Sequence, residues 1–178
     1  MVDRGPAEVQ TCLVYRRSCS DVPRLPDIEG LQFYLLDTPA RGARLWLPLM
    51  HDHGARALPR VIAKLIAPFR MMYCLVEDGA IVHHGWMVVG RSPLYHVGPA
   101  DVVIGPISTR EDRRGRGFAP FGLGKAMRAM QARGHPAFFI HTYDHNAASQ
   151  RAIAKCGFGA PIAAVPRLTQ RRPSSFAR

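Results

Sequence analysis

A short loop rich in glycine and arginine constrains the fold more than any other part of this sequence. The loop is Arg114-Gly115-Arg116-Gly117-Phe118-Ala119. The apolar run at residues 101–109 before it favours a strand, and Pro120 after it suits the first turn of a helix. A strand that leads through glycines into a helix predicts a β–loop–α unit at residues 101–133, with Gly134 as the stop.

This loop has the properties of a phosphate-binding site. Glycine permits backbone conformations that a Cβ obstructs, and the N–H groups at a helix N-terminus attract anions. Arg114 and Arg116 add charge-assisted hydrogen bonds. Because Pro120 lacks an N–H, residues 115–119 must supply most of the donors. The pattern is neither a P-loop nor a Gly-x-Gly-x-x-Gly dinucleotide motif. A plain turn with solvated arginines stays open as the alternative.

The rest of the chain alternates between strand-like and helix-like patterns. Apolar runs predict strands at 31–36, 71–76, 80–89 and 137–143, and helical spacing predicts helices at 55–69 and 146–156, with a helix also compatible with 41–50. The tripeptide Glu77-Asp78-Gly79 predicts a hairpin turn. From residue 71 the order is strand, strand, strand, helix, strand, helix. This order predicts an α/β (α+β) fold with a mixed sheet and at least one βα crossover.

Length and composition indicate one domain. The chain has 178 residues, of which 47% are hydrophobic, enough for a sizeable core. We divide it into a variable N-terminal segment (1–30), a domain (31–166) and a basic tail (167–178) that we expect to be flexible. No apolar run has the length of a membrane span, and the N-terminus lacks a secretory signal pattern. Four scattered cysteines without a C-x-x-C pair favour reduced thiols and a cytoplasmic protein.

The net charge of +11 favours an anionic partner. Twelve of the 24 basic residues lie between Arg110 and Arg172, where there are three acids. The sequence has no helix-turn-helix spacing, zinc finger or aromatic RNA-binding motif. A nucleic-acid-binding module therefore rests on charge alone and remains an alternative that we disfavour. The histidines at 51, 53, 83 and 84 lack the spacing of a zinc site, and we expect no metal.

The loop resembles the acetyl-CoA-binding motif of the GNAT acetyltransferase superfamily. That motif reads Arg/Gln-x-x-Gly-x-Gly/Ala, and Arg114, Gly117 and Ala119 occupy its defined positions. The hairpin at 71–89 resembles the second and third strands of the family. The order of elements over residues 101–158 also follows the family order.

A second segment strengthens the resemblance. Asn146-x-x-Ser149, followed by Lys155-Cys156-Gly157-Phe158, is similar to the helix after the fifth strand of the family. The resemblance implies a single mixed, mostly antiparallel sheet with splayed central strands, flanked by helices. It covers little of the chain before residue 55.

The resemblance also implies an activity. GNAT enzymes move an acetyl group from acetyl-CoA to an amine, less often a hydroxyl, by direct attack on the thioester and without a metal. The loop residues 114–119 would hold the CoA pyrophosphate, and the backbone at Ile107 and Thr109 would bond the pantetheine arm and the thioester. Asn146 and Ser149 would contact the cofactor, although both also suit a helix cap.

The sequence departs from the family at the position of its usual general acid. Many members carry a tyrosine seven residues after the asparagine, where this chain has Ile153. Isoleucine cannot protonate the leaving thiolate. Tyr143 and His141, near the end of the strand 137–143, are the closest substitutes by topology. Water, or a group elsewhere in the cleft, is an alternative proton donor. Tyr143 could equally be an aromatic side chain that only packs in the core or at an interface.

An amine acceptor also requires a general base, because a primary amine is mostly protonated at neutral pH. The candidates for this base are Glu111, His84 and Asp101. The alternative for Glu111 is an ion pair with a neighbouring arginine and no catalytic role. His83 and His84 are adjacent on a strand, so we expect their side chains to face opposite sides of the sheet.

The acceptor is the least constrained part of the interpretation. Residues 105–123 are most similar to GNAT members associated with bacterial surface-polysaccharide sugars. The basic charge would suit an acidic or phosphorylated acceptor such as a nucleotide-linked sugar, and a protein N-terminus is a second acceptor class. A catalytically silent CoA-binding domain and a homodimer also stay open.

Overall fold

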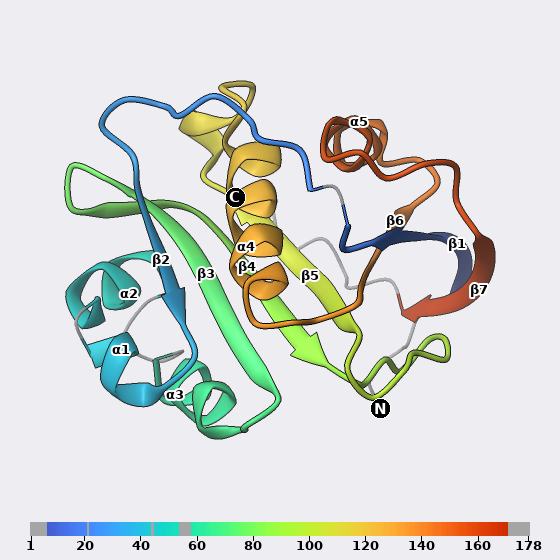
Figure 1. Ribbon diagram of the computed structural model, residues 1–178, viewed down its shortest axis with the longest axis horizontal. Coiled ribbons are helices and arrows are strands. Elements are labelled where there is room, and N and C mark those ends of the chain that lie inside the picture. The colour runs from blue at the N-terminus through green and yellow to red at the C-terminus, as the bar shows by residue number, and fades with distance from the viewer. Residues whose placement is uncertain (1–6, 21, 44, 54–57, 171–178) are drawn as a thin grey trace, which may run out of the picture.

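The computed structural model describes residues 7–20, 22–43, 45–53 and 58–170, and within them the chain forms one mixed sheet. Its strands are β1 (Ala7–Ser18), β2 (Gln32–Leu36), β3 (Arg70–Glu77), β4 (Ala80–Val89), β5 (Val102–Thr109), β6 (Ala137–Tyr143) and β7 (Ala163–Gln170). They lie in the order β2-β3-β4-β5-β6-β1-β7 (Figure 1). Every neighbouring pair is antiparallel except β5 and β6, which are parallel. The predicted mixed, mostly antiparallel sheet is therefore confirmed.

The helices cover both faces of the sheet. They are α1 (Pro39–Ala43), α2 (Trp46–His53), α3 (Leu58–Ile66), α4 (Phe118–Gln131) and α5 (Ala147–Lys155), and a 3-10 turn, η1, spans Glu111–Arg113. Alternate residues of β3 show the two layers. Tyr73 packs in the cluster of α4 and α5, whereas Met72 packs in the cluster of Leu49 and Leu65 from α2 and α3. None of the helices in the described part of the chain has the length and apolarity that a bilayer crossing requires.

The predicted hairpin is confirmed between β3 and β4. Asp78 and Gly79 both adopt left-handed backbone angles, with φ of 51° and 74°. A two-residue turn with two positive φ angles matches the twist of the flanking strands, and glycine adopts such an angle without strain. The predicted helix at 55–69 corresponds to α3, and residues 55–57 lie outside the described part of the chain.

The N-terminal segment contributes a strand to the interior of the sheet. β1 lies between β6 and β7, with Cys12 opposite both Tyr143 and Val165 (Figure 1). Its apolar run, residues 12–15, suits a strand that is covered on both faces. Residues 7–18, which the sequence analysis placed in a variable segment, are thus part of the same sheet as the rest.

The last strand crosses the predicted boundary between domain and tail. β7 continues through Arg167 to Gln170, with Pro166 opposite Thr11. A proline usually interrupts a sheet because it lacks an N–H, but an edge strand tolerates it. Residues 167–170 are therefore strand, and the remaining predicted tail, 171–178, lies outside the described residues.

The connection between β1 and β2 runs along α4 (Figure 1). Lys125 Nζ pairs with Asp27 Oδ1 at 2.6 Å, and the guanidinium of Arg128 donates to the carbonyl of Pro23 at 2.7 Å. Because these contacts come from one face of α4 and the sheet contacts the other, the helix is held on two sides.

Two glycines allow large polar rings to pack between the sheet and α4. A Cβ on Gly85 of β4 would lie 2.5 Å from the Tyr73 hydroxyl oxygen, and a Cβ on Gly122 of α4 would lie 2.7 Å from the ring of His83. Both rings are buried, and their centroids are 5.7 Å apart. The absence of a side chain at both glycines is therefore a packing requirement.

Two glycine-to-alanine substitutions in α4 can distinguish the effect of helix propensity on stability from the effect of this close packing. Gly124→Ala should raise the free energy of unfolding by about 1 kcal/mol, because alanine favours helix and the added Cβ makes only ordinary contacts. Gly122→Ala should lower it by about 1–2 kcal/mol, because the steric conflict with His83 exceeds the gain in propensity. Urea unfolding of both variants measures the difference, and equal stabilisation would contradict the close packing.

Candidate functional site

The two central strands separate halfway along their length. β5 and β6 pair only over residues 102–104 and 138–140. Beyond that point β5 follows β4, to the pair Thr109 and His83, while β6 follows β1, to the pair Tyr143 and Cys12. The predicted splay of the central strands is thus confirmed, and backbone groups that face the gap have no partner across it.

A pocket of about 300 Å³ occupies this gap. Five residues that the sequence analysis selected line it: Ile107, His141, Tyr143, Asn146 and Ser149. We call this cavity the fork pocket.

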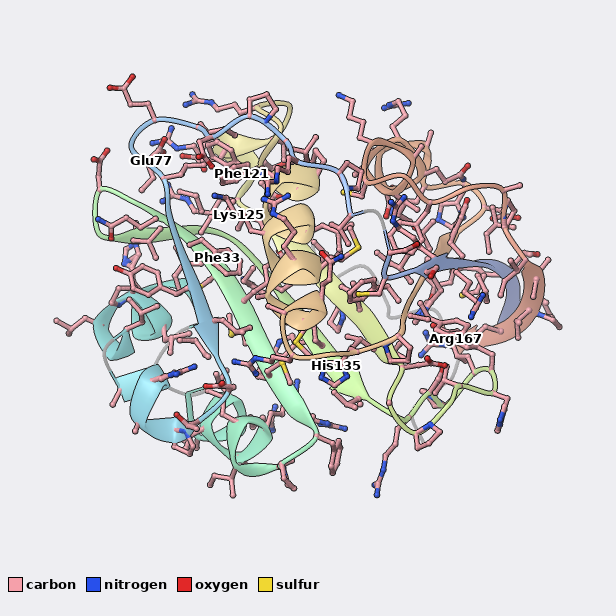
Figure 2. All side chains as sticks on the ribbon, in the orientation of Figure 1. Phe33, Glu77, Phe121, Lys125, His135 and Arg167 are labelled. Atoms are coloured by element: carbon pink, nitrogen blue, oxygen red, sulfur yellow. The ribbon has the colours of Figure 1, made fainter. Side chains whose placement is uncertain are left out.

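Two further lining residues of the fork pocket come from strands that the sequence did not predict. Cys12 and Arg167 come from β1 and β7 and line the same cavity. Figure 2 shows Arg167 on the β7 side of the molecule, far from Phe121 and Lys125 on α4. Only long-range strand pairing brings these residues to the pocket, so no local pattern could have indicated them.

The glycine-arginine loop has the backbone geometry of an anion-binding turn. We call residues 114–119 the cradle loop. Gly115 and Gly117 adopt left-handed φ angles of 79° and 81°, and a Cβ on either would meet nothing within 4 Å. Gly117 is the N-cap of α4, and no side chain caps the helix. The N-terminal N–H groups of α4, which lack partners within the helix, are thus uncapped beside open space.

The arginines near the cradle loop fall into two groups. Arg110 pairs with Asp112 at 2.8 Å, and Arg113 Nε lies 2.7 Å from Glu77 at the hairpin turn. The side chain of Arg114 remains 67% exposed, and among the described residues its ion-pair partner is Glu111, at 3.6 Å. Arg114 is therefore available to an anion, whereas Arg110 is paired within η1 and Arg113 holds the loop against the sheet.

Glu111, a predicted catalytic residue, does not reach the fork pocket. It lies on η1 with its side chain 90% exposed and is absent from the pocket lining. Thr109 also lies outside the lining, and its hydroxyl is 2.8 Å from His83 Nδ1. Asp101 accepts a hydrogen bond from the backbone N–H of Gly98 at 2.8 Å and so organises the preceding loop.

The adjacent histidines lie in different surroundings. His83 is buried beside α4, and burial, with His84 as a smaller cause, lowers its pKa to about 3. His84 is half-buried and lies opposite Cys74, whose side chain packs in the cluster that includes Leu49 of α2 and Leu65 of α3. The two rings therefore face opposite sides of the sheet, as predicted.

His141 is the titratable group best placed in the fork pocket. It is half-buried, and its Nδ1 lies 3.2 Å from the hydroxyl oxygen of Tyr95. Burial lowers the pKa of His141, and the positive charge of Arg167 lowers it further. The imidazole is therefore neutral at pH 7 and can accept a proton.

The other polar groups of the pocket lie at the N-terminus of α5. Tyr143 is half-buried, and its ring stacks on that of His145 with centroids 5.4 Å apart. Asn146 caps α5, since its Oδ1 accepts from the N–H of Ser149 at 3.0 Å. The amide nitrogen of Asn146 is still a donor for a ligand.

Ile153, which stands at the family position of the general acid, is 1% exposed and packs in the main core. Among the described residues, no group of three or more His, Cys, Asp or Glu side chains is arranged to hold a metal ion.

Comparison with known proteins relates this geometry to one family. The model of the acetyltransferase (GNAT) family matches residues 38–158, which include both the cradle loop and most of the fork pocket. The search among curated proteins gave no match.

Several solved structures share the fold at low sequence identity. A GNAT-family acetyltransferase from Colwellia psychrerythraea is 16% identical with a TM-score of 0.61, over 93% of this chain and 58% of that chain. A GCN5-related N-acetyltransferase from Sphaerobacter thermophilus is 18% identical with a TM-score of 0.63, over 94% and 54%. A GCN5-related glucosamine N-acetyltransferase region of a fungal multi-domain beta-N-acetylglucosaminidase is 12% identical with a TM-score of 0.62, over 92% and 21%. In each case this chain spans less than two thirds of the solved chain.

The contribution of Arg167 to the pocket can be measured directly. Arg167→Gln should raise the pKa of His141, because a neighbouring like charge disfavours the imidazolium. The pKa should stay below the usual histidine value, because burial is the larger cause. Proton NMR titration of the His141 ring measures it, with Arg116→Gln in the cradle loop as the control. An unchanged pKa in Arg167→Gln would place that guanidinium away from His141.

Proposed function

Because this chain belongs to the GNAT acetyltransferase family, we propose that it transfers an acetyl group from acetyl-CoA to an amine of a small acceptor molecule. The observation that carries the proposal is the position of two sites along one strand. β5 lines the fork pocket at Ile107 and ends at the turn that leads into the cradle loop. A long ligand could place its pyrophosphate at the cradle loop and the thioester at its end in the fork pocket.

The residues present fit coenzyme A. The uncapped N–H groups at the start of α4 would bind the pyrophosphate, with Arg114 and Arg116 as charged partners. The pantetheine arm would follow β5 into the fork pocket, where the diverging strands offer backbone groups without partners. The amide of Asn146 would donate to that arm.

We assign His141 as the general base. A primary amine attacks only after it loses a proton, and the neutral imidazole of His141 can accept one inside the pocket. The amine nitrogen then bonds to the carbonyl carbon, and the C–S bond breaks. Positioning of the amine and hydrogen bonds to the developing oxyanion would supply most of the rate enhancement.

Tyr143 would return a proton to the leaving thiolate. Its phenol lines the same pocket on the same strand as His141. His141 can then pass the proton that it took from the amine to the Tyr143 phenolate, which restores both side chains. The net reaction yields an amide and the free thiol of CoA.

The charge of the pocket favours an acceptor that carries an anionic group near its amine. Among the described residues that line the fork pocket there is no carboxylate, and Arg167 is exposed at its edge. A guanidinium binds phosphate or carboxylate through paired hydrogen bonds. A phosphorylated or nucleotide-linked amino sugar meets both requirements. The similarity of fold to a glucosamine N-acetyltransferase region supports an amino sugar.

We further propose that residues 7–170 form one acetyltransferase domain, since β1 and β7 complete its sheet. None of the four cysteines forms a disulfide, which supports a cytoplasmic location.

The cradle loop can be tested by CoA binding. The double variant Arg114→Gln with Gly117→Ala should lower the affinity for CoA at least about tenfold, because it removes a charged donor and strains the turn that aims the N–H groups. Gly134→Ala is the matched control, since Gly134 has a similar φ of 83° and equally open space but lies at the far end of α4. Isothermal titration measures both, and unchanged affinity in the folded double variant would refute the cradle assignment.

Turnover with matched acceptors tests the reaction and its acceptor class. Free CoA should appear when the protein is given acetyl-CoA with glucosamine 6-phosphate, and more slowly with glucosamine. Arg167→Gln should lower kcat/KM for the phosphorylated amine about tenfold and change kcat/KM for the neutral amine much less, because only the altered pKa of His141 affects the neutral amine. Equal losses for both amines would remove Arg167 from acceptor recognition. CoA binding without turnover of any amine would instead indicate a silent CoA-binding domain.

A further inference from the structure

We propose that a second hollow, which adjoins the fork pocket, binds the nucleoside part of the acceptor, so that the acceptor is a nucleotide-linked amino sugar. This hollow has a volume of about 430 Å³ and is lined by Val9, Gln10, Thr11, Asp144 and His145. We call it the edge hollow. Binding of a nucleoside here is a property of the folded protein, and its use in acetyl transfer rests on the proposed function.

The edge hollow and the fork pocket share a border. Cys12 and Tyr143, which line the fork pocket, lie opposite each other on β1 and β6. The adjacent residues Thr11 and Asp144 line the edge hollow. The ring of His145 stacks on that of Tyr143, with centroids 5.4 Å apart and an angle of 10° between the planes. A ligand that crosses this border can therefore occupy both cavities.

One wall of the edge hollow is strand backbone with no strand beside it. Within the described residues, β1 pairs with β6 only from Cys12 onward, because β6 ends at Tyr143 and leads into α5 (Figure 1). On this side the carbonyl of Thr11 accepts from the N–H of Asp144 at 3.0 Å. Alternate residues of a strand direct their N–H and C=O groups to the same edge. The N–H and C=O of Val9 therefore face this open edge, where no described strand pairs with them.

These groups suit the edge of a nucleobase. Val9 offers one donor and one acceptor side by side, and a base such as uracil presents an N–H beside a C=O. The side chain of His145 is 63% exposed, so its ring offers an aromatic surface on which a base can stack. Tyr143, His145 and the base would then form one continuous stack.

The carboxylate of Asp144 suits the ribose of the same nucleotide. Its Oδ1 accepts from the backbone N–H of His145 at 2.8 Å and lies 3.3 Å from the ring Nδ1, which leaves Oδ2 as an acceptor for a ligand. Carboxylates that accept from ribose hydroxyls recur in nucleotide-binding sites. Because a carboxylate repels phosphate, the anionic part of the nucleotide would lie away from Asp144.

Arg167 lies where that anionic part would be. It lines the fork pocket, and it lies opposite Gln10, which lines the edge hollow. An acceptor bound across both cavities would have its amine near His141, its phosphates near Arg167 and its nucleoside beyond them. A nucleotide-linked amino sugar has its groups in this order. A peptide strand could also use the backbone of Val9, but it has no phosphate for Arg167.

Binding of uridine diphosphate (UDP) tests the edge hollow without reference to activity. Excess coenzyme A is present, because it occupies any site for adenine nucleotides. UDP should bind at least about tenfold more tightly than inorganic pyrophosphate, because only UDP carries a nucleoside. His145→Ala should lower the affinity for UDP about tenfold and leave that for pyrophosphate unchanged. Isothermal titration measures both, and His51→Ala, which removes an exposed histidine of α2, is the matched control.

Amide hydrogen exchange, measured by NMR, then places the nucleoside on the strand edge. The N–H of Val9 faces the open edge, whereas that of Gln10 faces β7. UDP should slow exchange at Val9 at least about tenfold and leave exchange at Gln10 unchanged, because only Val9 gains a hydrogen-bond partner. Unchanged exchange at Val9, or exchange slowed by a pentaalanine peptide and not by UDP, would overturn the nucleoside site.

Asp144→Asn tests the ribose contact with a variant that leaves the ring of His145 in place. The amide oxygen can still accept from the N–H of His145, but the charge is lost. The ratio of the affinity for UDP to that for 2′-deoxy-UDP should fall several-fold, roughly the strength of one charge-assisted hydrogen bond to the missing hydroxyl. An unchanged ratio would overturn the contact between Asp144 and the ribose.

The outcomes separate this inference from the proposed function. UDP that binds no more tightly than pyrophosphate, or equally well to His145→Ala, would overturn the edge hollow as a nucleoside site. The expected UDP binding in a protein that acetylates neither UDP-linked glucosamine nor any other amine would support the edge hollow and refute the proposed acetyl transfer. Turnover of glucosamine 6-phosphate without preference for UDP-linked glucosamine would support acetyl transfer and overturn this inference.

Discussion

The divergence of β5 and β6 is the constraint on which the rest of this structure depends. A strand that leaves its neighbour exposes N–H and C=O groups, and unpaired backbone groups are costly when buried. Here each diverging strand stays paired along its other edge, since β4 accompanies β5 as far as Thr109 and β1 accompanies β6 as far as Tyr143, so only the groups that face the gap lack a strand partner. The N-terminal strand is therefore what allows the fork pocket to open beside β6, and it also brings Cys12 to the pocket wall.

The same divergence couples the two ends of the proposed cofactor site. β5 continues beyond the pocket, and the hydroxyl of Thr109 and the ring of His83 join its end to β4 at 2.8 Å. Arg113 then ties η1 to Glu77 on the hairpin. The cradle loop thus begins from a fixed point, and Gly117 turns the chain into α4 without strain. Composition alone would be compatible with any polyanion as the partner of this positive cluster. The backbone geometry of the cradle loop is suited to one pyrophosphate.

The sequence predicted those parts of the fold that local patterns determine. The hairpin, the β5–loop–α4 unit, β6 and α5 follow from periodicity, glycine positions and caps within each segment. β1 and β7 were not predicted, because their roles depend on pairing between residues more than a hundred positions apart, such as Cys12 with Val165. In the sequence, Pro166 also indicates the end of a strand, and only its position in an edge strand shows why the strand continues past it. Arg167 was missed for the same reason, and Tyr95 was missed because it lies in a loop that only the tertiary fold brings to His141, whereas Asn146 and His141 lie in segments that the sequence defined.

Ile153 has no proton to donate, so the proposed proton transfers fall to side chains of β6. The Ile153 side chain is 1% exposed and packs in the same core cluster as Phe138 and Ile140, so it supports α5 against the sheet. His141 and Tyr143 are two residues apart on one strand, and alternation places both on the same face, about 7 Å apart along the strand. A base and an acid at this spacing can serve opposite ends of one reacting centre, the incoming amine and the leaving sulfur. Their shared strand also means that β1, which pairs with β6, determines the position of both groups.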